Sequence, residues 1–167
     1  STYVTSLNTN GFTLGNGSGA SVADINASTN TYVAWCWKAG GAAVSNTSGT
    51  ITSQVSVNTT AGFSIVTWTG NGSASATVGH GLSSAPSLII LKNRTTNKSW
   101  PVMHTSLPSN GNMFLDLTQA YQTTYADGGI VNPATSTTFS FTTTGSLGQV
   151  NASANNYVAY CLSLIHI

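Results

Sequence analysis

The sequence contains very few charged side chains. Among 167 residues there are four basic and three acidic ones, glutamate is absent, and the formal net charge is +1. A near-neutral chain lacks the basic surface by which proteins bind nucleic acids or anionic membranes. It also lacks a run of about 18 apolar residues that could span a bilayer. We therefore expect neither nucleic acid nor membrane insertion among its interactions.

Cysteine is scarce as well. Cys36 and Cys161 show neither the Cys-x-x-Cys spacing nor the Cys/His spacing of a metal site. A disulfide between them would require an oxidising compartment, and the favoured interpretation is two buried free thiols that act as small hydrophobic groups. We expect no metal ion and no cofactor.

Small polar residues are abundant instead. Ser, Thr, Asn and Gly make up 82 of 167 residues, while hydrophobic residues still account for 40%. The apolar residues alternate in short segments that are separated by turn residues, which is typical of β-strands. Strands are expected at residues 49–58, 63–69, 74–78, 87–92, 99–104, 112–118, 138–143 and 157–161.

This pattern predicts an all-β fold, an antiparallel β-sandwich or jelly-roll-like architecture. Pro101 cannot donate a hydrogen bond to a sheet, so 99–104 is expected to be an edge strand. Residues 119–127 are the one plausible helical turn.

An internal repeat is the strongest organisational signal. Residues 24–36 align without gaps to residues 149–161, 125 positions later, and both copies follow a Phe-Thr segment and a Gly-rich turn. In both copies, at residues 32–36 and 157–161, apolar residues fall on both faces of the predicted strand, as in a strand that is covered on two sides. The repeat marks the C-terminal end of a structural unit.

The repeat sets the predicted domain boundaries. Residues 1–40 are expected to be the C-terminal part of a preceding β repeat, 41–60 a linker and connecting strand, and 61–161 a complete sandwich. Residues 162–167 resemble the in-frame translation of a sequencing-library adapter, and we expect them to be an artefact. The alternative is a short apolar terminal strand. The whole chain is expected to be a fragment of a longer protein.

Candidates for catalysis are weak. A glycosidase needs two carboxyl groups with separated pKa values, and the complete unit offers only Asp116, expected to face solvent, and Asp127, expected in a turn. His80, between two glycines, is expected to order a loop through backbone hydrogen bonds, and His104 to be structural. No catalytic residue is predicted, and we expect the protein not to be an enzyme.

One cluster is chemically distinctive. Lys92, Arg94, Lys98 and Trp100 bring three of the four basic residues close to a tryptophan. Such a patch could bind an anionic glycan, with the indole stacking on a sugar ring. The alternative is a solvated hairpin tip whose charges serve solubility.

The order of several motifs resembles a repeated β-domain of marine bacteriophage structural proteins, found in tail fibres beside SPRY-like or concanavalin-like lectin domains. These motifs are Phe12-Thr-Leu-Gly, Tyr32-Val-Ala-Trp-Cys-Trp-Lys, Gly62-Phe-Ser-Ile-Val, Val78-Gly-His-Gly-Leu, Ala85-Pro-Ser-Leu-Ile-Ile-Leu-Lys-Asn-Arg94 and Tyr157-Val-Ala-Tyr-Cys161. The resemblance covers residues 11–161 and departs at residue 162, where the family would continue with an acidic, aromatic-containing stretch.

The resemblance implies a non-enzymatic virion component with an extracellular location. Other virion proteins, a host cell-surface glycan and further copies of the chain would be its partners, in a homo-oligomer. It would serve as a spacer or as a module for host adsorption through carbohydrate binding. Two other hypotheses remain: a bacterial surface adhesin or filament subunit, and, less favoured, a glycan depolymerase.

Overall fold

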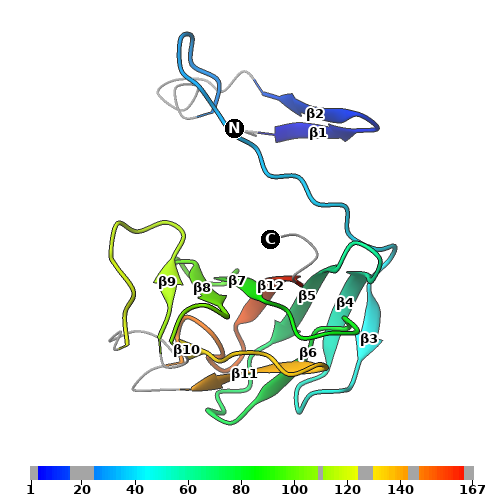
Figure 1. The fold of residues 1–167 in the computed structure, drawn as a ribbon, viewed down its shortest axis with the longest axis vertical. Helices are drawn as coiled ribbons and strands as arrows, with labels where there is room; N and C mark the ends of the chain where they lie inside the picture. The colour runs from blue at the N-terminus through cyan, green and yellow to red at the C-terminus, as the bar shows by residue number, and fades with distance from the viewer. Residues whose placement is uncertain (1–3, 16–24, 109–110, 124–129, 143–146, 164–167) are drawn as a thin grey trace. The chain divides into compact units, whose positions relative to one another are not determined.

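The computed structural model describes residues 4–15, 25–108, 111–123, 130–142 and 147–163. The chain forms two compact units, residues 1–36 and residues 37–167. Every regular element in the described residues is a β-strand, and all the strands in its sheets pair antiparallel. The predicted all-β sandwich class is confirmed (Figure 1). No helix in these described ranges is long and apolar enough to cross a membrane.

The second unit has two sheets. The larger one has seven strands in the order β3-β4-β5-β12-β7-β8-β9, and the smaller one has the order β10-β11-β6. The strands of the larger sheet are β3 (Val44–Asn46), β4 (Ser53–Asn58), β5 (Phe63–Thr69), β7 (Leu88–Asn93), β8 (Pro101–His104), β9 (Met113–Phe114) and β12 (Asn156–Leu162). Those of the smaller sheet are β6 (Thr77–Gly79), β10 (Ile130–Val131) and β11 (Thr138–Thr142). Figure 1 shows the smaller sheet layered against the larger one.

The core lies between these two sheets. Trp68 of β5 contacts three aromatic rings, at centroid distances of 5.6 Å to Phe139, 5.8 Å to Phe141 and 5.3 Å to Tyr157. All four side chains are buried. Aromatic residues of this size contribute most of the apolar area that a small sandwich buries, so Trp68 joins the two sheets at the centre of the core.

Strand β12 occupies the middle of the larger sheet. It pairs with β5 from Tyr157↔Trp68 to Leu162↔Phe63, and with β7 from Tyr157↔Asn93 to Leu162↔Leu88. Both faces of β12 are largely buried, which confirms the two-sided covering predicted for residues 157–161.

The first unit is smaller. Strands β1 (Val4–Asn8) and β2 (Gly11–Leu14) form an antiparallel hairpin. The predicted strand at 32–36 is not formed: these residues are extended, exposed and unpaired with any strand in the described part of the chain. Cys36 is consequently exposed rather than buried, whereas Cys161 is buried as predicted and both thiols are free.

Several boundaries differ from the expected ones. Strand β4 lies within the strand expected at 49–58, whereas β3 adds part of the expected linker to the larger sheet. Strand β8 is paired on both sides rather than at the edge, because Pro101 is its first residue and lies beyond the ladder with β7. The expected strand 112–118 shortens to the two residues of β9.

The remaining differences concern two short segments. No helical turn forms in residues 119–123, and residues 124–127 lie outside the described residues. Leu162, expected to start the artefactual end, continues β12 and is buried, and Ser163 donates its backbone N–H to the Gly62 carbonyl at 2.8 Å. Residues 164–167 lie outside the described residues.

Candidate functional site

The outer face of the larger sheet, which points away from the smaller sheet, holds the predicted basic cluster. Because side chains alternate along a strand, Trp68 and Tyr157 point into the core while Thr67 and Asn156 point outward. The same alternation places Lys92 on the outer face of β7. Arg94 follows two positions later and continues the pairing, since its N–H donates to the Asn156 carbonyl at 2.8 Å.

Lys92 and Trp100 form a cation–π pair. The Lys92 ammonium lies 5.3 Å from the centroid of the Trp100 ring, and it also donates a hydrogen bond to the main-chain carbonyl of Lys98. The Trp100 N–H in turn donates to Asp116 Oδ1 at 2.9 Å. The turn that joins β7 to β8 is thus closed by Lys92, and one face of the indole is occupied by that charge.

Asn93 anchors this turn from the core side. Its side chain is buried, and its Oδ1 accepts hydrogen bonds from the N–H groups of Thr95 at 2.9 Å and Thr96 at 3.0 Å. Its Nδ2 donates to the Gly148 carbonyl at 2.8 Å. A buried, fully bonded amide of this kind fixes the backbone on either side of it. The direction of the Arg94 main chain is therefore set by Asn93.

A polar hollow lies beside Arg94 on this face. Its volume is about 300 Å³. Hydroxyl, amide and guanidinium groups from four parts of the sheet line it, namely Thr52, Gln54, Thr67, Thr69, Arg94 and Asn156, with Trp68 and Tyr157 beneath. The Thr69 hydroxyl donates to Asn156 Oδ1 at 3.0 Å. Arg94 carries the single formal charge among the described residues that line the hollow.

A family model described as "Domain of unknown function (DUF7483)" matches residues 1–166. The chain belongs to this family. The comparisons with curated proteins and with solved structures found no match.

The DUF7483 fold brings together only some of the four residues of the predicted basic cluster, which are Lys92, Arg94, Lys98 and Trp100. Lys92 contacts the Trp100 ring and the main chain of Lys98, whereas Arg94 lines the hollow. Sequence reasoning missed the rest of the lining, because those residues come from strands that are far apart in the chain. The one available signal was the polar alternation of Thr67 and Thr69 in an otherwise apolar strand.

Among the described residues, Asp116 is the one acidic side chain, and it does not line this hollow. Asp116 is exposed and its Oδ1 accepts a hydrogen bond from the Trp100 backbone. Asp127 and Asp24 lie outside the described residues. In the described ranges, no three His, Cys, Asp or Glu side chains gather as a metal site would require.

His80 has the loop-ordering role that was predicted for it. Its buried ring places Nε2 3.2 Å from the Thr135 carbonyl, and Nδ1 accepts a hydrogen bond from the Leu82 N–H at 3.1 Å. This arrangement suits the neutral ring with its proton on Nε2. Burial lowers the pKa of His80, partly opposed by the hydrogen bond to Thr135. His104 likewise orders a turn, through its Nδ1 and the Ser106 N–H at 3.1 Å.

Proposed function

We propose that this DUF7483 chain is a non-enzymatic structural module of a phage tail fibre or similar virion appendage. In this role it is a β-rich spacer that presents the outer face of its larger sheet to a host-surface glycan. Its neutral Ser/Thr/Asn/Gly-rich composition supports this proposal, as does the order of motifs that resembles phage structural domains.

The polar hollow is the observation that carries the binding half of the proposal. Sugars are recognised by hydrogen bonds to hydroxyl and amide groups and by stacking on aromatic rings, and none of these requires a charged surface. The hollow offers hydroxyl groups from Thr67 and Thr69 and amides from Gln54 and Asn156. The Trp100 ring lies against the Lys92 ammonium, whose side chain is on the same sheet face.

Arg94 selects an acidic sugar as the ligand in this proposal. A guanidinium group binds a carboxylate or sulfate through two parallel hydrogen bonds, and Lys92, two residues earlier on the same face, adds a second positive charge. A shallow site of this kind binds weakly by itself. Several copies in an oligomeric fibre would raise the overall affinity through avidity.

The binding proposal is tested by titrating the chain with an oligouronate and following its backbone amides by NMR. We expect shifts at Thr67, Thr69 and Asn156, and an affinity that is reduced roughly 10- to 100-fold in Arg94→Gln, the range for a lost charged hydrogen bond. Lys38→Gln is the matched control, because it removes one positive charge away from the hollow. Equal affinities of the two variants, or shifts that leave the hollow unaffected, would contradict the proposal.

The virion assignment has a separate test in the gene neighbourhood. Capsid and terminase genes beside the full-length gene are the expected result. Genes for surface export or filament assembly would instead favour a bacterial adhesin or filament subunit. Release of reducing ends from a host polysaccharide would favour a depolymerase over both.

A further inference from the structure

The first unit shares local structure, as well as sequence, with the last quarter of the second unit. Tyr32 accepts a hydrogen bond at its hydroxyl from the Ala27 N–H at 2.7 Å, and Tyr157 accepts the same bond from the Ala152 N–H at 2.8 Å. In the first copy, the turn between residues 27 and 32 is closed by a hydrogen bond from the Asn30 N–H to the Ala27 carbonyl at 3.4 Å. The second copy has the same bond 125 positions later, from the Asn155 N–H to the Ala152 carbonyl at 3.3 Å.

The backbone conformation repeats as well. Thr29 and Ala154 occupy corresponding positions, and their φ angles of 73° and 62° are the positive ones among described non-glycine residues. Left-handed backbone is unfavourable for such residues, so its occurrence at the same place in both copies identifies one shared local fold. In the first copy this fold forms although residues 32–36 pair with no strand in the described part of the chain.

The hairpin that precedes this turn repeats too. Strands β1 and β2 pair Val4 with Leu14, and strands β10 and β11 pair Val131 with Phe141. Val131 and Phe141 lie 127 positions after Val4 and Leu14, respectively. Phe139 lies 127 positions after Phe12 in the same way. Residues 1–36 therefore hold the counterparts of β10, β11 and the β12 segment, and none of the described residues among them corresponds to β3 to β9.

An apolar pocket lies in the first unit. The pocket has a volume of about 560 Å³ and is lined by residues that include Val4, Phe12, Leu14 and Tyr32. In the second unit the counterparts of the last three, Phe139, Phe141 and Tyr157, all contact Trp68 of β5. The side chain that fills the corresponding space in the complete unit is thus an aromatic residue of a β5-type strand.

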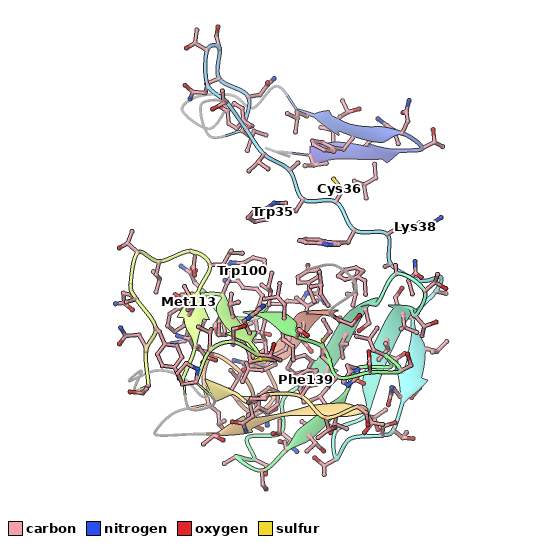
Figure 2. All side chains as sticks on the ribbon, in the orientation of Figure 1. Trp35, Cys36, Lys38, Trp100, Met113 and Phe139 are labelled. Carbon is pink, nitrogen blue, oxygen red and sulfur yellow. The ribbon has the colours of Figure 1, made fainter. Side chains whose placement is uncertain are left out.

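Three residues that line the pocket are exposed, whereas their counterparts in the second unit are buried. Val4, Phe12 and Tyr32 are 49%, 38% and 47% exposed, whereas Val131, Phe139 and Tyr157 are 1%, 1% and 0% exposed. Figure 2 shows Trp35 and Cys36 projecting from an extended segment and Phe139 inside the sandwich. An exposed apolar surface of this kind is typical of an interaction site.

We infer that the first unit is a docking surface for the β4-to-β8 strands of another copy of this same repeat. The β5-type strand of that copy pairs with one edge of residues 32–36, and its β7-type strand pairs with the other edge. Its aromatic residue equivalent to Trp68 enters the pocket between Phe12 and Tyr32. The result is a second complete sandwich of the same kind as residues 37–163.

The turn after the β5-type strand adds specificity to this docking. In the second unit, Asn151 is buried and its Nδ2 donates to Asn71 Oδ1 at 2.8 Å and to the Ser73 carbonyl at 2.9 Å. The Gly70 N–H donates to the Asn155 carbonyl at 2.8 Å, and a side chain at Gly70 would collide with the Ala152 carbonyl. Asn26 is the exposed counterpart of Asn151, so a Gly-Asn-Gly-Ser turn is the chemistry that would satisfy it.

The test supplies these strands to the intact chain. Residues 37–130 are duplicated and placed directly before Val4, so that Ile130 precedes Val4 as it precedes Val131 in the native sequence. Hydrogen exchange of the amides of residues 32–36 is measured in this tandem protein and in the parent chain. We expect roughly 10³-fold or greater slowing in the tandem, the protection typical of a strand inside a sheet.

A matched control carries Trp68→Asp and Leu91→Asp in the inserted copy alone. It keeps the length of the tandem but cannot fill the pocket, so fast exchange at 32–36 is expected. Amides 157–161 in the same molecule report that the second unit remains folded. Fast exchange at 32–36 in the intact tandem would overturn the inference, as would equal protection in the control. Slow exchange at residues 32–36 in the parent chain, which has no inserted strands, would also overturn it, because another partner would then cover the pocket.

A second variant tests the same inference without an insertion. The two copies differ at five of thirteen aligned positions. The full chain carrying Gln149→Asp, Val150→Ile, Ala154→Thr, Asn156→Thr and Tyr160→Trp therefore has the first copy's sequence in the β12 position. We expect a folded protein whose melting temperature lies within about 10 °C of the parent. Failure to fold would show that the first copy's sequence is unsuited to a central strand.

Discussion

Residues 25–36 and 150–161 are nearly the same sequence in two different environments. Both form the same tyrosine-capped turn, yet only the second continues as a strand, because β5 and β7 lie on either side of it. Strand formation in this repeat therefore depends on partner strands, whereas the turn is encoded locally. Strand propensity is context-dependent for the same reason.

The largest expected difference between the two copies concerns their thiols. Burial raises the pKa of Cys161 to about 12, while Cys36 is exposed. Because the thiolate is the reactive form, a pKa near 12 leaves only about 10⁻⁴ of the thiol ionised at pH 8. We expect a thiol reagent to modify Cys36 at least about 10³-fold faster than Cys161 in the folded chain. Comparable rates in Cys36→Ser and Cys161→Ser variants would contradict the proposed difference.

Aromatic side chains in the two copies are expected to contribute unequally to stability. Trp68→Ala removes three ring contacts from a closed core and is expected to lower the free energy of unfolding by about 3–5 kcal/mol. Trp35→Ala is the control, because its side chain is 65% exposed and its loss should change stability by less than about 0.5 kcal/mol. Urea unfolding of both variants measures the difference. Similar losses would mean that the first copy is packed as well as the second.

The shared tyrosine allows a comparison of one hydroxyl group in two settings. Tyr157→Phe leaves the Ala152 N–H without its partner in a buried environment, and we expect a loss of about 1–3 kcal/mol. Tyr32→Phe removes the same hydrogen bond where water can replace it, so the expected loss is under about 0.5 kcal/mol. Equal losses of the free energy of unfolding, measured with urea, would show that burial does not change the contribution of this hydrogen bond.

The smallest expected effect is a pH dependence that belongs to the complete unit. Burial lowers the pKa of His80 in the folded state, so below about pH 6.5 the unfolded chain binds more protons than the folded chain. Stability is therefore fully present above that pH and decreases as the pH falls toward 5. His80→Gln should lose this dependence, and His104→Gln should keep it. A melting temperature that is independent of pH between 7 and 5 in the parent would contradict this assignment.

Local patterns predicted much of the fold. The β-branched and aromatic residues of 63–69 predicted the bounds of β5, and the apolar run at 87–92 predicted β7 within one residue. The same reasoning failed at 32–36, because alternation reports the faces a strand would have and not whether neighbours exist to pair with it. The repeat itself was visible in the sequence, but the sequence did not show that only the second copy pairs with neighbouring strands.

The candidate site was predictable only where it is local. Lys92 and Trp100 are close in the sequence and meet across one turn. Thr52, Thr67 and Asn156 meet Arg94 only because the sheet order places β12 between β5 and β7. Such an order joins the last strand of the unit to an early one, and no local pattern encodes it.

Hydrogen exchange of the intact chain tests most directly the claim that partner strands decide the structure of this repeat. The amides of residues 157–161 should exchange near the rate of global unfolding, and those of residues 32–36 should exchange roughly 10³-fold faster or more. The turn amide of Ala27, held by the Tyr32 hydroxyl, should be slower than its neighbours in the first copy. Equal protection of residues 32–36 and 157–161 would contradict the account.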